Sequence, residues 1–543
     1  MPLSIQKCYW CLEDEMPRFF REKYPLSSMN EQELSSSEFH NYLHFPYGNV
    51  KLAGSECGFL RNFWPSSRNP IVRGGCKKVC NINNNSNIVT AFSYQSGFKK
   101  RVFIANDRAI YDVSYPELGE AVKPCVYNMH SGDWSTFQFS TPEKTFLIAV
   151  NGKDERQIYD GNQWISDHPK IIFEGNNNKD YIRFLYGWMF KNRQWYIASY
   201  SMDAWYLPIR SLGGVAKVFP LGGIMQSGGS LIAGFSWSTE SGDGLSALCV
   251  FISTVGEVAV YGGDDPDNAS SFALKAIYHI GRPLGKNAIA FVRNDVLIAT
   301  INGLISMKNI LVMEGKESLP LSWSIQEEWD QSVVASPVGW SLTVWEKRNM
   351  LLVTFPRNSI LSDKTFVMNI SNNNWSSFHN WLAQAYVISN ENVFFGDYEG
   401  SFWQGDITGS DNGKPFSAVY LSYFQAGNSY LSKKKRACFA NMTISAYERP
   451  YVKLFARSDY DKSYPNFSKA TINNHPDIGG IWDNSAWDYS SWRDDFFVRK
   501  KIIFNFCQNV TAYGDFLAIG CIITSAGMDI NDIQINNAKL LIE

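Results

Sequence analysis

Three features are scarce in this sequence, and each scarcity excludes a class of protein. Cysteine contributes 10 of 543 residues, too few and too scattered for a disulfide scaffold. Charge is almost balanced, with a formal net charge of -2, which argues against a dedicated DNA-binding surface. No apolar run reaches the roughly 18 residues that a membrane-spanning helix needs. We therefore expect a protein without a membrane span that matures in a reducing cytoplasm.

Helical periodicity is also missing, because no amphipathic pattern is sustained over three turns beyond the N-terminal region. Charges interrupt the first residues, MPLSIQKCYWCLEDEMPRFF, where a secretory core would lie, so export by a signal peptide is not expected. Aromatic residues make up 15% of the chain and Gly occurs 40 times. Aromatic side chains favour half-buried strands, and Gly favours tight turns. The composition indicates a large all-β protein.

A two-strand sequence pattern recurs along most of the chain. Each copy has an apolar strand, a turn rich in Asn, Gly or Asp, and a second strand, which is typical of a β-hairpin. The first strands of the copies contain Val102, Phe146, Trp195, Cys249, Val296, Leu351 and Val393, at intervals of 42 to 55 residues. Four short strands with their turns need about 40 to 55 residues, so one copy corresponds to one propeller blade. The spacing predicts a β-propeller of six or seven blades.

Changes in pattern divide the chain into three parts. Residues 1–60 contain acidic and Ser-rich stretches without strand alternation, and we interpret them as an N-terminal extension or arm. The hairpin repeat fills residues 61–409. Residues 410–543 contain six strand-like segments without the blade period, which predicts a β-sandwich-like C-terminal domain or a last blade with additions. Because propellers often close with a strand from the opposite terminus, this domain is also a candidate for propeller closure.

A tryptophan-rich segment lies in the C-terminal part. Trp482, Trp487 and Trp492 are spaced by five residues, which fits neither a helix nor a strand. We expect a loop whose indoles pack on the sandwich, and a carbohydrate-stacking platform is the alternative.

Two cysteine pairs have spacings that resemble metal ligands. Cys8 and Cys11 form a C-x-x-C motif, and Cys76 and Cys80 form a looser pair far from the first. A zinc ribbon needs two close pairs that converge on a tetrahedron. The sequence therefore favours unpaired thiols and predicts no metal site, while metal binding by Cys8 and Cys11 stays open.

A propeller glycosidase or sialidase is the enzymatic alternative, since such enzymes gather carboxylates at the centre of the ring. Turn carboxylates are present at Asp133, Asp160, Asp243, Asp264 and Asp397. Asp is, however, an ordinary turn residue, and repeated sialidase Asp boxes, a G-x-S-x-G elbow, a P-loop and H-E-x-x-H are all missing. The sequence predicts no catalytic residue, no cofactor site and no enzymatic activity.

Two short segments carry basic residues that could contact a partner. The KKKR run at residues 433–436 could contact phosphate, although a short basic turn between strands is usually solvated. The IGRPLGK segment at 280–286 combines Pro283, which fixes φ, with two glycines, which predicts an ordered loop between strands. We expect Arg282 and Lys286 to point toward a carboxylate or a neighbouring subunit, and they are our candidates for an inter-subunit contact.

Two segments of the chain carry a resemblance to a known family. The first contains RNFWP at 61–65, VRGG at 72–75, VTAFSYQSG at 89–97 and IYDVS at 110–114. The second contains GEVAVY at 256–261, DP at 265–266 and IGRPLGK at 280–286. Together they resemble virion structural proteins encoded by phages and prophages of alphaproteobacteria, most clearly over residues 61–307. That family is similar in organisation to the tail nozzle, or tail tubular, proteins of short-tailed phages.

The resemblance implies a structural role in a phage tail. It implies a homo-oligomeric ring, six copies by analogy with nozzles, around the channel through which DNA is ejected. Expected partners are a tail adaptor and tail fibre or tip proteins, and DNA passes without sequence-specific binding. The expected location is the virion tail, assembled in the cytoplasm of the bacterial host. The alternative is a receptor-binding or glycan-cleaving propeller of the tail.

Overall fold

The chain folds into two compact units, Gly75–Asn412 and the combination of Met1–Gly74 with Gly413–Glu543. No helix of the described residues is long and apolar enough to cross a membrane. The structure, a computed structural model, describes residues 42–45, 60–66, 69–82, 86–115, 122–174, 182–241, 244–312, 319–356, 364–426, 434–463, 501–527 and 529–542.

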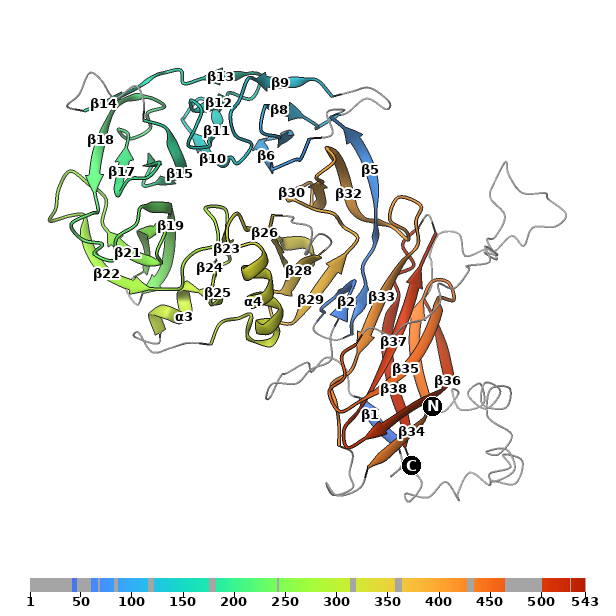
Figure 1. Cartoon of the computed structure of the whole chain (residues 1–543). Coiled ribbons are helices and arrows are strands. Elements are labelled where there is room, and N and C mark those ends of the chain that lie inside the picture. The colour runs from blue at the N-terminus through green and yellow to red at the C-terminus, as the bar shows by residue number, and fades with distance from the viewer. Residues whose placement is uncertain are drawn as a thin grey trace, which may run out of the picture. The chain divides into compact units, whose positions relative to one another are not determined.

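The larger unit is a β-propeller. Its described strands form seven small sheets that follow one another in chain order around a ring (Figure 1). The predicted all-β propeller of six or seven blades is confirmed. The seven hairpins predicted from the sequence correspond to the second and third strands of the seven blades. These strands could be recognised because they are the most continuously apolar part of each blade.

Blades 1 to 4 each contain four antiparallel strands, and blade 3 carries a short fifth strand, β14, parallel to β18. The strand bounds are β6 (Thr90–Ser96), β7 (Lys99–Ala105), β8 (Ala109–Asp112) and β9 (Pro124–Tyr127) in blade 1; β10 (Ser135–Ser140), β11 (Thr145–Val150), β12 (Gln157–Tyr159) and β13 (Trp164–Ser166) in blade 2; β14 (Ile171–Phe173), β15 (Phe184–Phe190), β16 (Arg193–Ala198), β17 (Asp203–Tyr206) and β18 (Gly214–Pro220) in blade 3; β19 (Leu231–Ser241), β20 (Gly244–Ser253), β21 (Glu257–Gly262) and β22 (Ala273–His279) in blade 4.

Blade 5 has three strands, and helical turns follow them in the chain. The bounds are β23 (Ile289–Val292), β24 (Asp295–Thr300), β25 (Gly303–Ser306), α3 (Met307–Val312), η3 (Trp323–Ile325) and α4 (Gln326–Ala335) in and after blade 5; β26 (Ser341–Trp345), η4 (Glu346–Arg348), β27 (Met350–Thr354), β28 (Lys364–Asn369) and β29 (Trp375–His379) in blade 6; β30 (Ala385–Ser389), β31 (Asn392–Gly396) and β32 (Ser401–Thr408) in blade 7.

The ring is closed by a strand from the N-terminal side of the propeller. β5 (Gly75–Asn81) pairs antiparallel with β32, with Cys80 opposite Phe402 and Cys76 opposite Gly405. The earliest strand of the propeller thereby becomes the fourth strand of its last blade. The closing strand comes from residues 75–81 and not from the C-terminal domain, which the sequence left as a candidate.

A repeated polar cap ends the second strand of several blades. Asn106 accepts hydrogen bonds from the backbone N–H groups of residues 108 and 109, and Asn151 accepts them from residues 153 and 154. Asp397 accepts them from residues 399 and 401. All three side chains are buried, so each cap satisfies turn donors that water does not reach.

Adjacent blades pack through aromatic clusters. In the cluster between blades 3 and 4, Trp195 is fully buried and its ring centroid lies 5.7 Å from that of Phe251. Another cluster joins Phe103 of blade 1 to Tyr159 of blade 2, with centroids 5.0 Å apart. Large flat rings fill the wedge between twisted sheets, which accounts for the high aromatic content.

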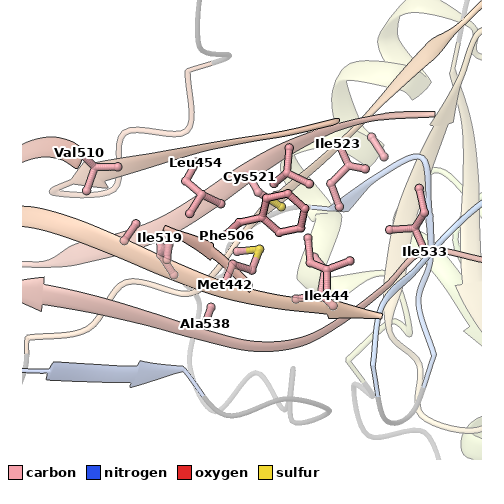
Figure 2. Packing of buried hydrophobic residues seen from close by; sticks show 14 of the residues in the cluster. Met442, Ile444, Leu454, Phe506, Val510, Ile519, Cys521, Ile523, Ile533 and Ala538 are labelled. Carbon is pink, nitrogen blue, oxygen red and sulfur yellow. The ribbon is translucent and has the colours of Figure 1, made fainter. Parts of the chain in front are cut away.

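The second unit is a β-sandwich, the first of the two alternatives predicted for the C-terminal region. One sheet, called sheet A, has the order β3-β4-β38-β34-β36, with β1 also paired to β38, and the other has the order β2-β33-β37-β35. Residues from both sheets fill the core, as Figure 2 shows for Met442, Phe506 and Ile519. The bounds are β1 (Tyr42–Phe45), β2 (Leu60–Arg61), β3 (Phe63–Trp64), β4 (Ile71–Val72), β33 (Phe416–Leu421), β34 (Lys435–Ala446), β35 (Tyr451–Ser458), β36 (Ile502–Gly514), β37 (Leu517–Ser525) and β38 (Gln534–Ile542).

The segment around residues 60–74 belongs to the sandwich unit, although its sequence suggested the start of the propeller. β2 pairs with β33 and β4 pairs with β38. Several predictions fall on residues outside the described part of the chain: most of the N-terminal arm with Cys8 and Cys11, Asp243, Lys433, and the Trp482, Trp487 and Trp492 loop.

Candidate functional site at the propeller axis

The loop of residues 280–286 connects blades 4 and 5. Its backbone is hydrogen-bonded on both sides: Ile280 donates to the carbonyl oxygen of Gly256 at 2.8 Å, and Leu284 donates to that of Ala299 at 3.0 Å. The loop is therefore an ordered connection, as its Pro and Gly content predicts. It delivers Lys286 to the start of β23.

Lys286 is buried within its own chain. Its Nζ lies 2.5 Å from the carbonyl oxygen of Asp133, 3.3 Å from that of Leu185 and 3.5 Å from Oδ2 of Asp133. Beside it, Nδ2 of Asn287 donates to Oδ1 of Asp133 at 3.2 Å and to the carbonyl oxygen of Trp134 at 3.3 Å. We call these contacts of Lys286 and Asn287 with Asp133, Trp134 and Leu185 the axial cluster.

The axial cluster joins blades that are distant in the ring. Asp133 lies just before β10, Leu185 lies in β15 and Lys286 lies just before β23. These are the first strands of blades 2, 3 and 5, and Figure 1 shows the first strands nearest the centre of the ring. The Lys286 side chain thus connects the inner strands of three blades near the propeller axis. Packed side chains therefore cross the propeller interior at this cluster.

The charged ammonium group of Lys286 is buried, which is unfavourable for the charge. Burial lowers the pKa of its ammonium, and the Asp133 carboxylate offsets part of that effect. Two carbonyl oxygens and one carboxylate supply acceptors for the ammonium donors. These contacts hold the Lys286 side chain between the inner strands of three blades.

Arg282 behaves differently from Lys286. It is exposed, and within the described ranges its side chain makes a single long hydrogen bond, 3.5 Å from Nη2 to the carbonyl oxygen of Pro337. Lys286 meets the predicted carboxylate inside its own chain, whereas Arg282 keeps its guanidinium at the surface. The expectation of an inter-subunit contact therefore rests on Arg282.

The described turn carboxylates have separate structural partners. Asp133 is in the axial cluster, and Asp160 accepts from the backbone N–H groups of residues 162 and 163. Asp264 pairs with Lys191 at 2.7 Å. Asp397, 2% exposed, accepts from its own turn and from Nε1 of Trp403 at 2.8 Å. Each is engaged as a cap or an ion-pair partner.

Cys76 and Cys80 lie on one strand, four residues apart, and both are buried. Four residues of strand span about 13 Å, too far for two ligands of one metal ion. Burial raises the pKa of the Cys80 thiol to about 11, which keeps it protonated. Over the described ranges, no group of three or more His, Cys, Asp or Glu is placed to hold a metal.

The sequence did not single out one polar cluster, formed by His130, Asn151 and Asp154. Oδ1 of Asp154 lies 2.6 Å from Nδ1 of His130, and its Oδ2 accepts from the His130 backbone N–H at 2.9 Å and from Nδ2 of Asn151. Burial tends to raise the pKa of Asp154, but these hydrogen bonds lower it on balance. The Asn-x-x-Asp turn after an apolar strand is the signal that could have located it.

Comparison with known proteins shows a similarity of fold only. No family model and no curated protein matches the chain. Among solved structures, it is similar to YCF48 from Cyanidioschyzon merolae, with 10% identity, a TM-score of 0.37 and coverage of 61% of this chain and 98% of that one. It is also similar to the β-propeller domain of Cps50 (Swd1) from Myceliophteria thermophila, with 10% identity, a TM-score of 0.39 and coverage of 61% and 100%.

Proposed function

We propose that this chain is a structural subunit of a phage tail or phage-like particle, forming a closed ring around the channel through which DNA leaves. The observation that carries the proposal is the resemblance of residues 61–307 to virion structural proteins of alphaproteobacterial phages. By analogy with nozzles the ring contains six copies. Its partners are a tail adaptor and fibre or tip proteins, and it is assembled in the host cytoplasm.

The chemistry of the described residues supports a role that is performed by assembly. The turn carboxylates that could have served a glycosidase cap backbone donors or pair with lysines. The formal net charge of -2 also suits a conduit, because each Lys or Arg contact to phosphate would add a binding well along the path of the DNA. We propose that the protein has no hydrolase activity.

The axial cluster supports one further point about the conduit. Lys286 and Asn287 bridge the propeller interior to Asp133. These contacts support the proposal that the DNA path lies between copies of the chain and not through the propeller of one copy.

The test uses particles that lack the protein. Such particles should package DNA but fail to retain or deliver it, and purified wild-type virions should contain the chain at a fixed copy number. Its absence from purified virions would refute the proposal. Cleavage of host polysaccharide at a rate that falls on Asp133→Asn or Asp397→Asn would favour the glycan-cleaving alternative.

A further inference from the structure

A closed ring of identical copies needs two different, complementary patches on each copy. The first candidate patch is the helical segment of residues 319–338, between β25 and β26. It contains three carboxylates and no Lys or Arg. It also exposes large apolar side chains: Leu319, Trp323, Val334 and Val338 are 66%, 54%, 84% and 59% exposed. Such a group of exposed apolar side chains is typical of an interaction surface.

Two of these carboxylates have no cationic partner within the described ranges. Glu328 is neutralised by Lys364, whose Nζ lies 2.7 Å away. Glu327 and Asp330 are exposed on the first half of α4, and Asp330 accepts only an amide N–H from Gln326 at 2.7 Å. Arg282 reaches the far end of the segment, at the carbonyl oxygen of Pro337. The helical segment therefore presents an acidic and apolar surface.

The second patch is the outer face of sheet A. Strands β34, β36 and β38 contain no Asp or Glu, and their only charged residues are Lys435, Arg436 and Lys539. β36 has no charge and no Pro along its 13 residues. The cores of protein interfaces are depleted of charged residues, so the lack of Asp and Glu on these strands is characteristic of a surface that a partner covers.

The outward side chains of sheet A combine cations, amides and an aromatic ring. Arg436 lies opposite Tyr513 in the β34–β36 register, and Nζ of Lys434 lies 5.7 Å from the Tyr513 ring centroid. Lys434, Arg436 and Tyr513 are exposed, Tyr513 by 62%. Farther along, Lys539 is opposite Asn441. Lys434 and Arg436 form no ion pair over the described ranges, so this face is basic and partly apolar.

We propose that the helical segment of one copy docks on the outer face of sheet A of the next copy, an inference that rests on the ring of the proposed function. Charge complementarity supports this pairing, because, over the described residues, the carboxylates of the helical segment without a cationic partner would face the cations of sheet A without an anionic partner. Exposed apolar side chains lie beside both sets of charges. The two patches differ, so the contact is heterologous and propagates from copy to copy. A ring results when the rotation closes.

Charge reversal tests the contact in the full-length chain. The helix variant is Glu327→Lys with Asp330→Lys, and the sheet variant is Lys434→Glu with Arg436→Glu. Each variant alone should remain monomeric in sedimentation velocity while the wild type assembles. An equimolar mixture should recover assembly, because the reversed patches complement each other as the native ones do. Melting temperatures within a few degrees of wild type will show that both variants fold.

Matched controls reverse exposed charges outside the two patches. Glu143→Lys with Glu399→Lys and Lys153→Glu with Lys275→Glu should assemble as the wild type does. Controls that fail equally, a mixture that stays monomeric, or wild-type chain that is monomeric up to about 1 mM would each overturn the contact. Charge-reversal variants that assemble normally would also refute this contact, but they would not contradict the proposed ring. The virion content of the chain decides the proposed function separately.

Discussion

Arg73 donates from Nε to Oδ1 of Asn62 at 3.0 Å, and its guanidinium lies 4.0 Å from the ring centroid of Phe416. Arg73 is 1% exposed, so its buried charge links its own segment, VRGG, to the RNFWP segment. Asn62 in turn donates to the carbonyl oxygen of Ser417 at 2.8 Å. These contacts tie residues 60–74 to the sandwich.

The first prediction follows from this planar, stacked guanidinium. Arg73→Lys should destabilise the sandwich by about 2–3 kcal/mol, because Lys keeps the charge but loses the stacking and the directed bonds. Calorimetry of the intact chain will measure the loss. Arg210→Lys at an exposed position is the control, and equal melting temperatures for the two variants would contradict the role of Arg73.

The second prediction concerns the axial cluster. Lys286→Met should lower the stability of the propeller by about 1–3 kcal/mol, because the carbonyl oxygens of Asp133 and Leu185 lose their donor. The gain from removing a buried charge opposes part of that loss. Urea unfolding followed by tryptophan fluorescence will measure it, with Lys275→Met as the exposed control. A more stable Lys286→Met variant would show that the buried charge outweighs its bonds.

A third prediction separates backbone strain from steric conflict at two turn glycines. Gly97 and Gly256 have φ values of 55° and 94°. A Cβ at Gly97 would meet nothing within 4 Å, whereas one at Gly256 would lie 2.2 Å from the carbonyl oxygen of Ile280. Gly97→Ala should cost about 1 kcal/mol, and Gly256→Ala should cost at least about 2 kcal/mol more. Equal losses in thermal unfolding would contradict the crowding at the blade 4 turn.

The fourth prediction is a pH dependence at Asp154. Its pKa in the folded protein is lower than its ordinary value of 3.8, so its stabilising effect is complete above that value and is lost as pH falls through the folded pKa. Asp154→Asn should therefore be less stable than the wild type at pH 7, by about 1–2 kcal/mol, with a smaller difference near pH 3. Denaturant titrations at the two pH values will measure both differences. A constant difference would exclude titration of Asp154 as its cause.

The fifth prediction concerns Arg282. Because its guanidinium is exposed and makes only a long bond to Pro337 among the described residues, Arg282→Ala should leave the melting temperature nearly unchanged. It should weaken assembly of the ring instead, measured by sedimentation. Loss of melting temperature in the monomer, with assembly unaffected, would count against a contact at this residue.

The sequence by itself determined the propeller and the strands of the C-terminal region, which it left as either a sandwich or a last blade with additions. Each blade contributes a hairpin whose two strands are apolar enough to be recognised from the sequence alone, from Val102 to Val393. In several blades a local residue such as Asn151 caps the turn of this hairpin. The six C-terminal strands were found for the same reason, because alternation and strand length are local properties.

Only the tertiary structure decided which distant residues meet. The pairing of Cys80 with Phe402 closes the ring across more than 300 residues, and no local pattern marks it. The sequence predicted that Lys286 points toward a carboxylate or a neighbouring subunit, but only the curvature of the seven blades brings Asp133 and Leu185 to it and buries it. The Arg73 segment likewise joined the sandwich unit, where β2 pairs with β33 and β4 pairs with β38, and no local pattern in the sequence marks these partners.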